Sequence, residues 1–513
     1  MVPTTSAAEP TRAVRGGPSA PTANAGRRTL LACELLLLAV AAGEFARQAL
    51  LIRQRIAAPF QFDYEEGNIL NTLARIAHGL SPYPDPHAFP NVLNPYGPAG
   101  YYLLAMPVKL FGIAFAPARL AVVASVLAIC VLVALTIMRL GGSRPAAVAF
   151  GLMFPALAVA QPWTGLLRVD FLGLAFSLAG VYVFCGAAGR DLGAKAGRSL
   201  PFLYWLAAAL LVAALMVKYT LLAAPAACVL SLIVERRWKE AARFAGIGVA
   251  LSGAALAIAA ALTRGAIFTH LFLTHPDPFS WRAYGESVSA MVAGHRVLAA
   301  LAGVRLITEL RARKVSVSTL WVVLALATLV TTGKLGSTQN HLLEWPLSLC
   351  LCAGMGFSAL LRATPRPLML AAVVAATVWL GAFLIRQAPY NPLAEVAQCP
   401  AAYAFIAAQK SDRILSENVG ALVLAGKTVW VSNPFVYTQL RVRSGWPDAG
   451  MEGMIQSGGF DLIVTSWDYP AYELFRQAGA ERFSRAAVNA MAANYRVART
   501  FRCQDAAFVM ERR

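Results

Sequence analysis

Long apolar stretches recur along the first three quarters of the chain, and short polar segments that carry most of the charges separate them. A helix needs about 20 apolar residues to cross the hydrocarbon core of a bilayer. The pattern therefore predicts an all-α polytopic membrane protein with about eleven transmembrane helices, followed by a small α/β unit. The predicted helices lie at 29–50, 117–138, 145–162, 170–187, 201–217, 219–234, 243–263, 288–308, 316–333, 341–361 and 367–386.

One further apolar segment, 97–113, is too short for a span, begins with Gly97-Pro98 and contains Lys109. These features are typical of a helix that lies in the membrane interface. Counting it as a span would move the basic segment 235–243 to the outer face. Because basic loops stay in the cytoplasm, we predict an interfacial helix here.

Basic residues between the predicted spans indicate the sidedness of the protein. With a cytoplasmic N-terminus, eighteen basic residues fall in six cytoplasmic segments, and the C-terminal segment lies outside. We therefore expect a multi-pass protein of the inner (plasma) membrane. The cytoplasmic segments are 1–28, 139–144, 188–200, 235–243, 309–314 and 362–366.

The composition supports this prediction, since 58% of the residues are hydrophobic and only 14% are charged. A soluble protein has about 25% charged residues. A net charge of +19 would suggest nucleic acid in a soluble protein, but here the basic residues are topology signals. Nucleic acid is therefore excluded as a partner, and membrane lipids are expected.

The two ends of the chain differ from the apolar part. Residues 1–28 are rich in Ala, Pro, Ser, Thr and Gly, which predicts a disordered cytoplasmic tail. The apolar run 30–42 lacks a convincing cleavage site, so we expect residues 29–386 to form one transmembrane domain whose first helix is retained. Its first extracytoplasmic loop is 53–116.

The remaining segment, 387–513, alternates predicted helices and strands, as expected for a compact extracytoplasmic α/β domain. It holds two of the eight cysteines, Cys399 and Cys503. A disulfide between them and two separate thiols are both open at this point. Helices are predicted at 401–412 and 451–459, and strands at 427–432 and 460–466.

The loop 53–116 contains three carboxylates within four positions, Asp63, Glu65 and Glu66. Carboxylates at a membrane surface are costly unless they are solvated or used. One of them could be a general base for an acceptor hydroxyl, or the group could hold a divalent cation. A solvated acidic loop is the plainer interpretation.

Other predicted outer edges carry cations on the same side of the membrane, namely Arg168, Lys218 and Lys334. These cations have no matching acidic excess in the predicted layout. Cations beside a carboxylate base suit a substrate with a phosphate leaving group. The other polar candidates at these edges are Asp170, Asn340, His341 and Glu344.

The loop 264–290 holds His270, His275 and Asp277, whose spacings of five and two residues do not match a helical metal site. We interpret it as a connector or a cover over the substrate. We expect no metal site and no required cofactor. A divalent cation at the carboxylates is an alternative that no ligand set supports.

Several short motifs resemble those of the C-type membrane glycosyltransferases, in particular the group related to protein mannosyltransferases and lipid A aminoarabinose transferase. The acidic motif Asp63-x-x-Glu66-Gly67 resembles the motif of the first outer loop in that group. Gly97-Pro98 stands where the group has Pro-Pro, and the inserted Tyr64 leaves open whether Glu65 or Glu66 is the second functional acid. Further matching segments are Asn94–Gly112 with Tyr96 and Tyr101, Leu167–Asp170, Lys218–Thr220 and Gly336–Glu344.

This resemblance implies an enzyme that takes a sugar from a polyprenyl-phosphate donor at the outer face. Asp63 would be the base that deprotonates the acceptor hydroxyl, and the anomeric configuration would invert. Arg168 and Lys218 would bind the phosphate, while Glu66 would orient a substrate. The acceptor would be a glycan, a lipid or a protein.

Two other classes of protein share parts of the pattern. A secondary transporter would keep ionisable residues near the bilayer midplane and often shows internal repeats, whereas the carboxylates here lie in a loop. A polysaccharide-assembly membrane protein would carry its function in the segment 399–513. We favour the glycosyltransferase.

Overall fold

The computed structural model describes most of the chain. The predicted features at residues 1–19 and 189–199, and at His275 and Asp277, lie outside the described residues. Those described are 20–188, 200–274, 278–334, 336–337, 339–363, 367–387, 390–391, 393, 396–447, 450–468, 482–503, 506 and 508–513.

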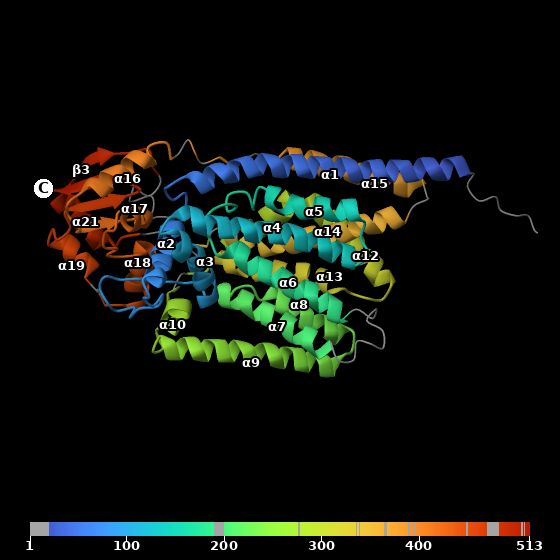
Figure 1. The fold of residues 1–513 in the computed structure, drawn as a ribbon, viewed down its shortest axis with the longest axis horizontal. Coiled ribbons are helices and arrows are strands. Elements are labelled where there is room, and N and C mark those ends of the chain that lie inside the picture. The colour runs from blue at the N-terminus through green and yellow to red at the C-terminus, as the bar shows by residue number, and fades with distance from the viewer. Residues whose placement is uncertain are drawn as a thin grey trace, which may run out of the picture.

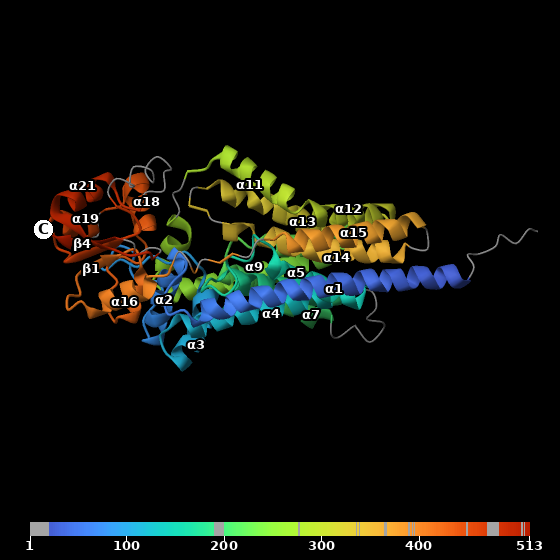
Figure 2. The same ribbon diagram turned by 90° about the horizontal axis from the view of Figure 1, so that it is seen from above.

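Long helices run side by side along the long axis of the molecule, and the α/β unit lies at one end of them (Figures 1 and 2). The α4–α5 and α8–α9 connections lie at the opposite end of the bundle (Figure 1). The helices of the bundle are α1 (Ala20–Ala57), α4 (Phe115–Arg139), α5 (Arg144–Ala156), α6 (Asp170–Ala188), α7 (Leu200–Val217), α8 (Ala223–Val234), α9 (Trp238–Leu262), α12 (Arg296–Arg311), α13 (Val317–Thr328), α14 (Glu344–Arg362) and α15 (Pro367–Ile385).

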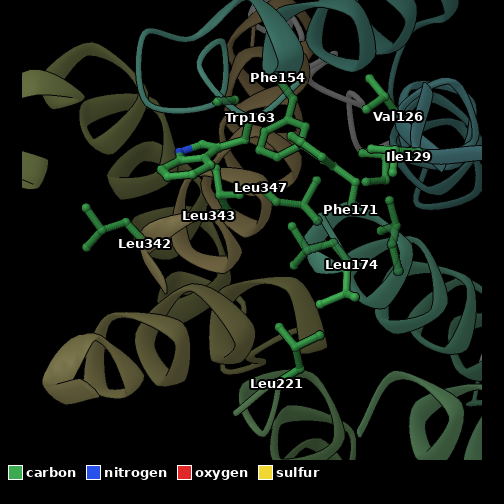
Figure 3. Packing of buried hydrophobic residues seen from close by; sticks show 14 of the residues in the cluster. Val126, Ile129, Phe154, Trp163, Phe171, Leu174, Leu221, Leu342, Leu343 and Leu347 are labelled. Carbon is green, nitrogen blue, oxygen red and sulfur yellow. The ribbon is translucent and has the colours of Figure 1, made fainter. Parts of the chain in front are cut away.

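Helix α14 forms the centre of the bundle, because every residue from Glu344 to Ser358 is buried. It packs against α4, α5, α12, α13 and α15. Near its start, Leu343 and Leu347 lie in a cluster with Phe154 of α5 and Phe171 of α6 (Figure 3). Several polar candidates adjoin this cluster in the sequence, so the apolar packing fixes the backbone from which they project.

The described residues contain six helices that are long and apolar enough to span a membrane, and a seventh span if one bent pair is counted. They define a multi-pass membrane protein. The predicted count of eleven is not confirmed, although each predicted segment overlaps a helix, since α5, α7, α8 and α13 are shorter than a full span.

The predicted continuous span 288–308 is wrong, because α11 (Trp281–Gly294) and α12 meet at His295 with a bend of 80°. Only Met291 is buried in α11, whereas α12 packs on α14 and buries Val297, Leu298 and Leu301. The break turns the apolar face of α12 towards the core and leaves α11 at the surface.

The predicted disordered tail is also corrected within its described part, since α1 begins at Ala20. Pro21 stands in the first turn, where its missing N–H costs no helical hydrogen bond. The helix has 38 residues, so it is about 57 Å long at 1.5 Å per residue and exceeds the bilayer core.

Two helices of the first outer loop, α2 (Tyr64–Ala77) and α3 (Pro98–Phe111), pack on each other at the end of the bundle near the α/β unit (Figure 1). Helix α3 exposes Met106, Leu110 and Phe111, which is the pattern of an interfacial helix. Shorter helices lie between the long helices along the chain, namely α10 (Ala266–Phe268), η2 (Thr269–Leu273), η3 (Leu329–Gly333) and η4 (Gln339–Leu342).

The C-terminal unit, residues 396–513 in its described part, contains a four-stranded sheet of order β1-β2-β4-β3. Strands β1 and β2 are parallel, and β4 is antiparallel to both β2 and β3. Cys399 and Cys503 form a disulfide across this unit. Its elements are α16 (Cys399–Ala408), β1 (Ile414–Ser416), α17 (Val419–Leu424), α18 (Pro434–Ser444), α19 (Met451–Gln456), β2 (Leu462–Thr465), α21 (Arg485–Asn494), β3 (Tyr495–Thr500) and β4 (Phe508–Arg512).

The predicted strand 427–432 is wrong, because this segment does not join the sheet. Two of its backbone hydrogen bonds go to the loop 53–116 instead: Asn91 N donates to Trp430 O, and Ser432 N donates to Asn91 O. Strand β1 takes the place beside β2. The segment therefore joins the C-terminal unit to the membrane unit, which consists of the helical bundle and the loop 53–116.

Candidate active site

The acidic motif lies at the start of α2, where Asp63 is the N-cap and its Oδ1 accepts from Glu65 N over 3.1 Å. Capping fixes the first turn of the helix, which carries Glu65 and Glu66. The Asp63 carboxylate keeps 23% of its side-chain surface exposed. It therefore remains accessible to a substrate.

Arg168 joins Asp63 to two other polar side chains. Its Nη1 donates to Asp63 Oδ1 over 2.7 Å, and its Nη2 donates to Tyr96 Oη over 3.0 Å. Its Nε lies 3.5 Å from Asp170 Oδ2. The guanidinium also lies against the ring of Trp163. These contacts hold a buried cation between two carboxylates.

Asp170 is the first residue of α6 and the centre of a second set of contacts. Its Oδ1 accepts from Lys218 Nζ over 2.6 Å and from Asn340 Nδ2 over 3.0 Å. The predicted excess of cations is thus corrected, because Arg168 and Lys218 both pair with carboxylates. A buried ammonium or guanidinium is too costly to leave unpaired.

A small cavity of about 20 Å³ lies beside this cluster, enough for roughly one water molecule. Asp170, Lys218, His341 and Glu344 line it, together with Asn340. Glu344 Oε1 accepts from Trp321 Nε1 and from Ala224 N, so this carboxylate also ties α14 to α13 and α8. The structure thus brings four of the predicted polar residues together with Lys218.

Glu66 is buried completely, and Arg119 binds both of its oxygens. Phe62 N and Leu167 N donate to the same two oxygens over 2.7 and 2.6 Å. The predicted role of Glu66 in the reaction stays a prediction, and in this geometry every oxygen is engaged and no surface is exposed. Through Leu167 N, Glu66 also fixes the backbone just before Arg168.

Glu65 is half-buried and lies beside Asp63 and Arg168. Asn433 Nδ2 donates to its Oε1 over 2.9 Å, and Asn68 Nδ2 to its Oε2 over 3.4 Å. Burial raises the pKa of the Glu65 carboxyl; the Arg168 cation opposes the rise and the Asp63 carboxylate adds to it. Of the two acids after Asp63, only Glu65 is placed at the open side of the cluster.

Tyr96 and Tyr101 occupy different positions. Burial raises the pKa of the Tyr96 phenol, which therefore stays protonated beside Arg168. Tyr101 is almost fully buried behind it and packs on Tyr83, so it supports the site from within. A Cβ at Gly97 would overlap the carbonyl group of Met216. Glycine at this place lets α3 begin close to the end of α7.

Lys334, the remaining predicted phosphate contact, and His270, which is not among the predicted site residues, have other surroundings. Lys334 is exposed, and no described residue forms an ion pair with its ammonium. His270 is buried, accepts from Asn94 N at Nδ1 and donates from Nε2 to Pro84 O. Within the described ranges, no group of three or more His, Cys, Asp or Glu side chains could hold a metal ion.

An apolar groove of about 680 Å³ lies between α7, α8 and α9. It begins at Leu222 and Pro225 of the α8 entry, directly after the segment 218–221 that lines the polar cavity. Leu211, Val229 and Gly248 line it further along. Residues that line the polar cavity and residues that line the apolar groove are thus consecutive in the sequence at the start of α8.

Sequence reasoning missed Asn433, which lies 368 residues from its partner Glu65. The only local signal was Asn433-Pro434, which indicates a helix start and no contact. It also missed the fully buried Arg119 as the partner of Glu66. Neither pairing has a sequence spacing from which it could be inferred.

Comparison with solved structures identifies the fold. The chain is similar to ArnT from Cupriavidus metallidurans bound to undecaprenyl phosphate, with a TM-score of 0.61, 12% identity, and coverage of 91% of this chain and 97% of ArnT. The apo form of that protein gives a TM-score of 0.60 and 13% identity over 91% and 96% of the two chains. The apo oligosaccharyltransferase of Archaeoglobus fulgidus gives 0.54 and 11% identity over 87% and 72%.

No protein-family model and no curated protein sequence matches the chain. The structural matches nevertheless cover most of the chain at TM-scores above 0.5. The protein therefore has the fold of the C-type membrane glycosyltransferases.

Proposed function

We propose that the protein is a membrane glycosyltransferase that moves a sugar from a polyprenyl-phosphate donor to an acceptor hydroxyl. The observation that carries the proposal is the cluster of Asp63, Arg168, Asp170 and Lys218 at one end of a C-type bundle. Such a cluster combines a partly exposed carboxylate with two cations, as the transfer of a group from a phosphate requires.

In the proposed reaction, Asp63 takes the proton of the acceptor hydroxyl. The acceptor oxygen attacks the anomeric carbon as the bond from that carbon to the phosphate oxygen breaks. The electron pair of this bond leaves with the prenyl phosphate, and the configuration at the anomeric carbon inverts.

Arg168 and Lys218 stabilise the charge that develops on the departing phosphate. Both are engaged by carboxylates, which hold them in place for the donor. When a phosphate draws Arg168 towards itself, Asp63 loses its ionic partner and becomes a better base. Lys334, Asn340 and His341 are further candidates for contacts with the donor.

The apolar groove supports a lipid-linked donor, because a prenyl chain can lie along it while its phosphate stays at the start of α8. ArnT, whose fold the chain shares, was solved with undecaprenyl phosphate bound. We place the cluster and the C-terminal domain, 387–513, on the outer face of the membrane. The bundle, 29–386, is the transferase domain in this proposal.

A deletion strain provides the first test. We expect a prenyl-linked sugar to accumulate in it, and mass spectrometry to identify that lipid. The purified protein in nanodiscs should then release prenyl phosphate from the lipid when deletion-strain membranes supply the acceptor. An unchanged lipid profile together with no release would contradict the proposal.

The Asp63→Asn variant tests the mechanism. A general base contributes about 10²- to 10⁴-fold to a rate, so we expect a loss of that size in transfer with an unchanged melting temperature. Normal transfer by Asp63→Asn would exclude Asp63 as the base.

A further inference from the structure

The C-terminal unit reaches the acidic motif through a set of contacts that the reaction itself does not explain. Helix α17 approaches α2 at Gly67, where a Cβ would overlap Gln61 Oε1 and the backbone nitrogen of Gly420. Gln61 Oε1 accepts from Gly420 N over 3.0 Å. The backbone of α17 in the C-terminal unit therefore lies directly against α2, next to the acidic motif.

The start of α18 reaches further, to the motif itself. Asn433 is the N-cap of α18, since its Oδ1 accepts from Val436 N over 3.1 Å. The same oxygen accepts from Tyr64 Oη over 3.3 Å, which leaves the amide nitrogen directed at Glu65. Because Oδ1 caps α18, the Nδ2 of Asn433 is the atom that faces the Glu65 carboxylate.

Contacts around Asn433 hold it firmly. The segment before it is bonded to the first outer loop, since Leu93 N donates to Ser432 Oγ over 3.0 Å. Asn433 is 1% exposed. Behind Tyr64, Arg482 lies over the phenol ring at 4.4 Å and donates to the buried Glu417. These contacts prevent the Asn433 amide from flipping, so its nitrogen faces Glu65 and its oxygen does not.

We propose that Asn433 is a positioning residue for the reaction, supplied by the C-terminal unit, which holds Glu65 ionised and directed towards the substrate beside Asp63. The inference rests on the proposed function, to which it adds a role for the C-terminal unit. Glu65 is the residue that touches the sugar or its acceptor, and Asn433 acts through it.

The charges around Glu65 determine the direction in which the pKa of its carboxyl should change when Asn433 is replaced. Asp63 and Arg168 face Glu65 from the membrane unit, and the phenols of Tyr64, Tyr96 and Tyr101 surround it. Burial already raises the pKa of Glu65. Because a hydrogen bond donated to the carboxylate favours the charged form, its loss raises the pKa further. The acidic limb of the pH–rate profile then moves to higher pH.

The variant Asn433→Asp tests this effect, because it removes the donor and adds a like charge beside Glu65, and both changes act in the same direction. Aspartate also caps helices and keeps the oxygen that accepts from Val436 and Tyr64, but it presents a carboxylate oxygen to Glu65 in place of the donor. We expect the acidic limb of kcat/KM to move up by about one pH unit or more, and the melting temperature to fall, because the new carboxylate is buried beside Glu65. The readout is prenyl phosphate released from the deletion-strain lipid by the full-length protein in nanodiscs.

Asn418→Asp is the matched control, because Asn418 caps α17 through Ala421 N in the same unit and accepts from Tyr403 Oη. Its pH–rate profile should equal that of the wild type. If Asn433→Asp does not fold, Asn433→Ser keeps a capping oxygen that is too short to reach Glu65, and the same displacement of the limb is expected.

A double variant separates the effect of the Glu65 charge from the effect of the hydrogen bond between residues 65 and 433. Glu65→Gln with Asn433→Asp restores a hydrogen bond of reversed polarity and removes the Glu65 charge, so we expect the double variant to be inactive at every pH. Recovery of transfer by the double variant would overturn the proposal, as would a wild-type pH–rate profile in every folded Asn433 variant. A wild-type protein that releases no prenyl phosphate would instead refute the proposed function.

Discussion

Arg119 binds Glu66 through two parallel contacts, Nε to Oε1 over 2.9 Å and Nη2 to Oε2 over 2.8 Å, and neither side chain is exposed. Arg119 also donates to the carbonyl groups of Arg55, Ala58 and Phe60. The pair therefore fastens the end of α1 and the start of α2 to α4, and lies under the site.

The first prediction follows from this burial. Replacing Glu66 by Gln leaves the Arg119 charge without its ionic partner, and breaking a buried pair costs about 3–5 kcal/mol. We expect a strong fall in melting temperature and in the yield of folded protein. A variant that melts like the wild type but transfers no sugar would support a catalytic role for Glu66.

The second prediction concerns the cations. Lys218→Met and Arg168→Met each remove a charged contact to the donor, so we expect the KM for the donor to rise about 10-fold or more. Arg282→Ala removes an exposed cation of α11 and should leave this KM unchanged. Lys334→Ala tests the third predicted phosphate contact, and an unchanged KM would remove Lys334 from the site. If the KM also stays constant in the Lys218 and Arg168 variants, neither residue binds the donor phosphate.

The third prediction tests the groove between α7, α8 and α9. Gly248 lines it and has open space where its Cβ would lie, so Gly248→Phe should fill part of it without a clash. Gly246 is equally open but does not line the groove, and Gly246→Phe is the matched control. We expect only the Gly248 variant to raise the KM for long-chain donors while a short-chain analogue is used normally. Equal effects on both chain lengths would place the prenyl chain elsewhere.

The fourth prediction is a dependence of stability on pH. Burial lowers the pKa of His270 to about 4, from an ordinary value of 6.5. The unfolded chain therefore binds the proton more readily than the folded chain between these two values, and stability falls as the pH drops through this window. The contribution is at most about 3 kcal/mol.

Melting curves at pH 7.5 and pH 5 measure this effect. The wild type should lose stability at pH 5, and His270→Asn should lose less, because it has no ring to protonate. A variant with the full pH dependence of the wild type would assign the effect to another group.

Much of the site could be predicted from local signals. Asp63, Arg168, Asp170 and Lys218 all flank apolar segments, and alternating spans return such flanks to the same end of a bundle. Helix α3 could be predicted in the same way, since its length and its proline set it apart from the spans. These features follow from the lengths and the order of the apolar segments, which can be read directly from the sequence.

The pairings within the site could not be predicted, because they depend on packing between distant segments. Asp170 neutralises Lys218 only because α6 and α7 lie together. The segment 427–432 has the composition of a strand, yet its backbone bonds with Asn91. A pattern of apolar residues indicates that a segment is buried, but it does not indicate which partner covers it.

The contact of Asn433 with Glu65 also has a consequence for biosynthesis. The ribosome makes Glu65 early and Asn433 368 residues later, after every helix of the bundle. In the proposed topology, the C-terminal unit must then be exported before it can fold onto α2. A nascent or truncated chain would thus carry Asp63 and Arg168 in the membrane without a finished site, and transfer would begin only when synthesis and export are complete.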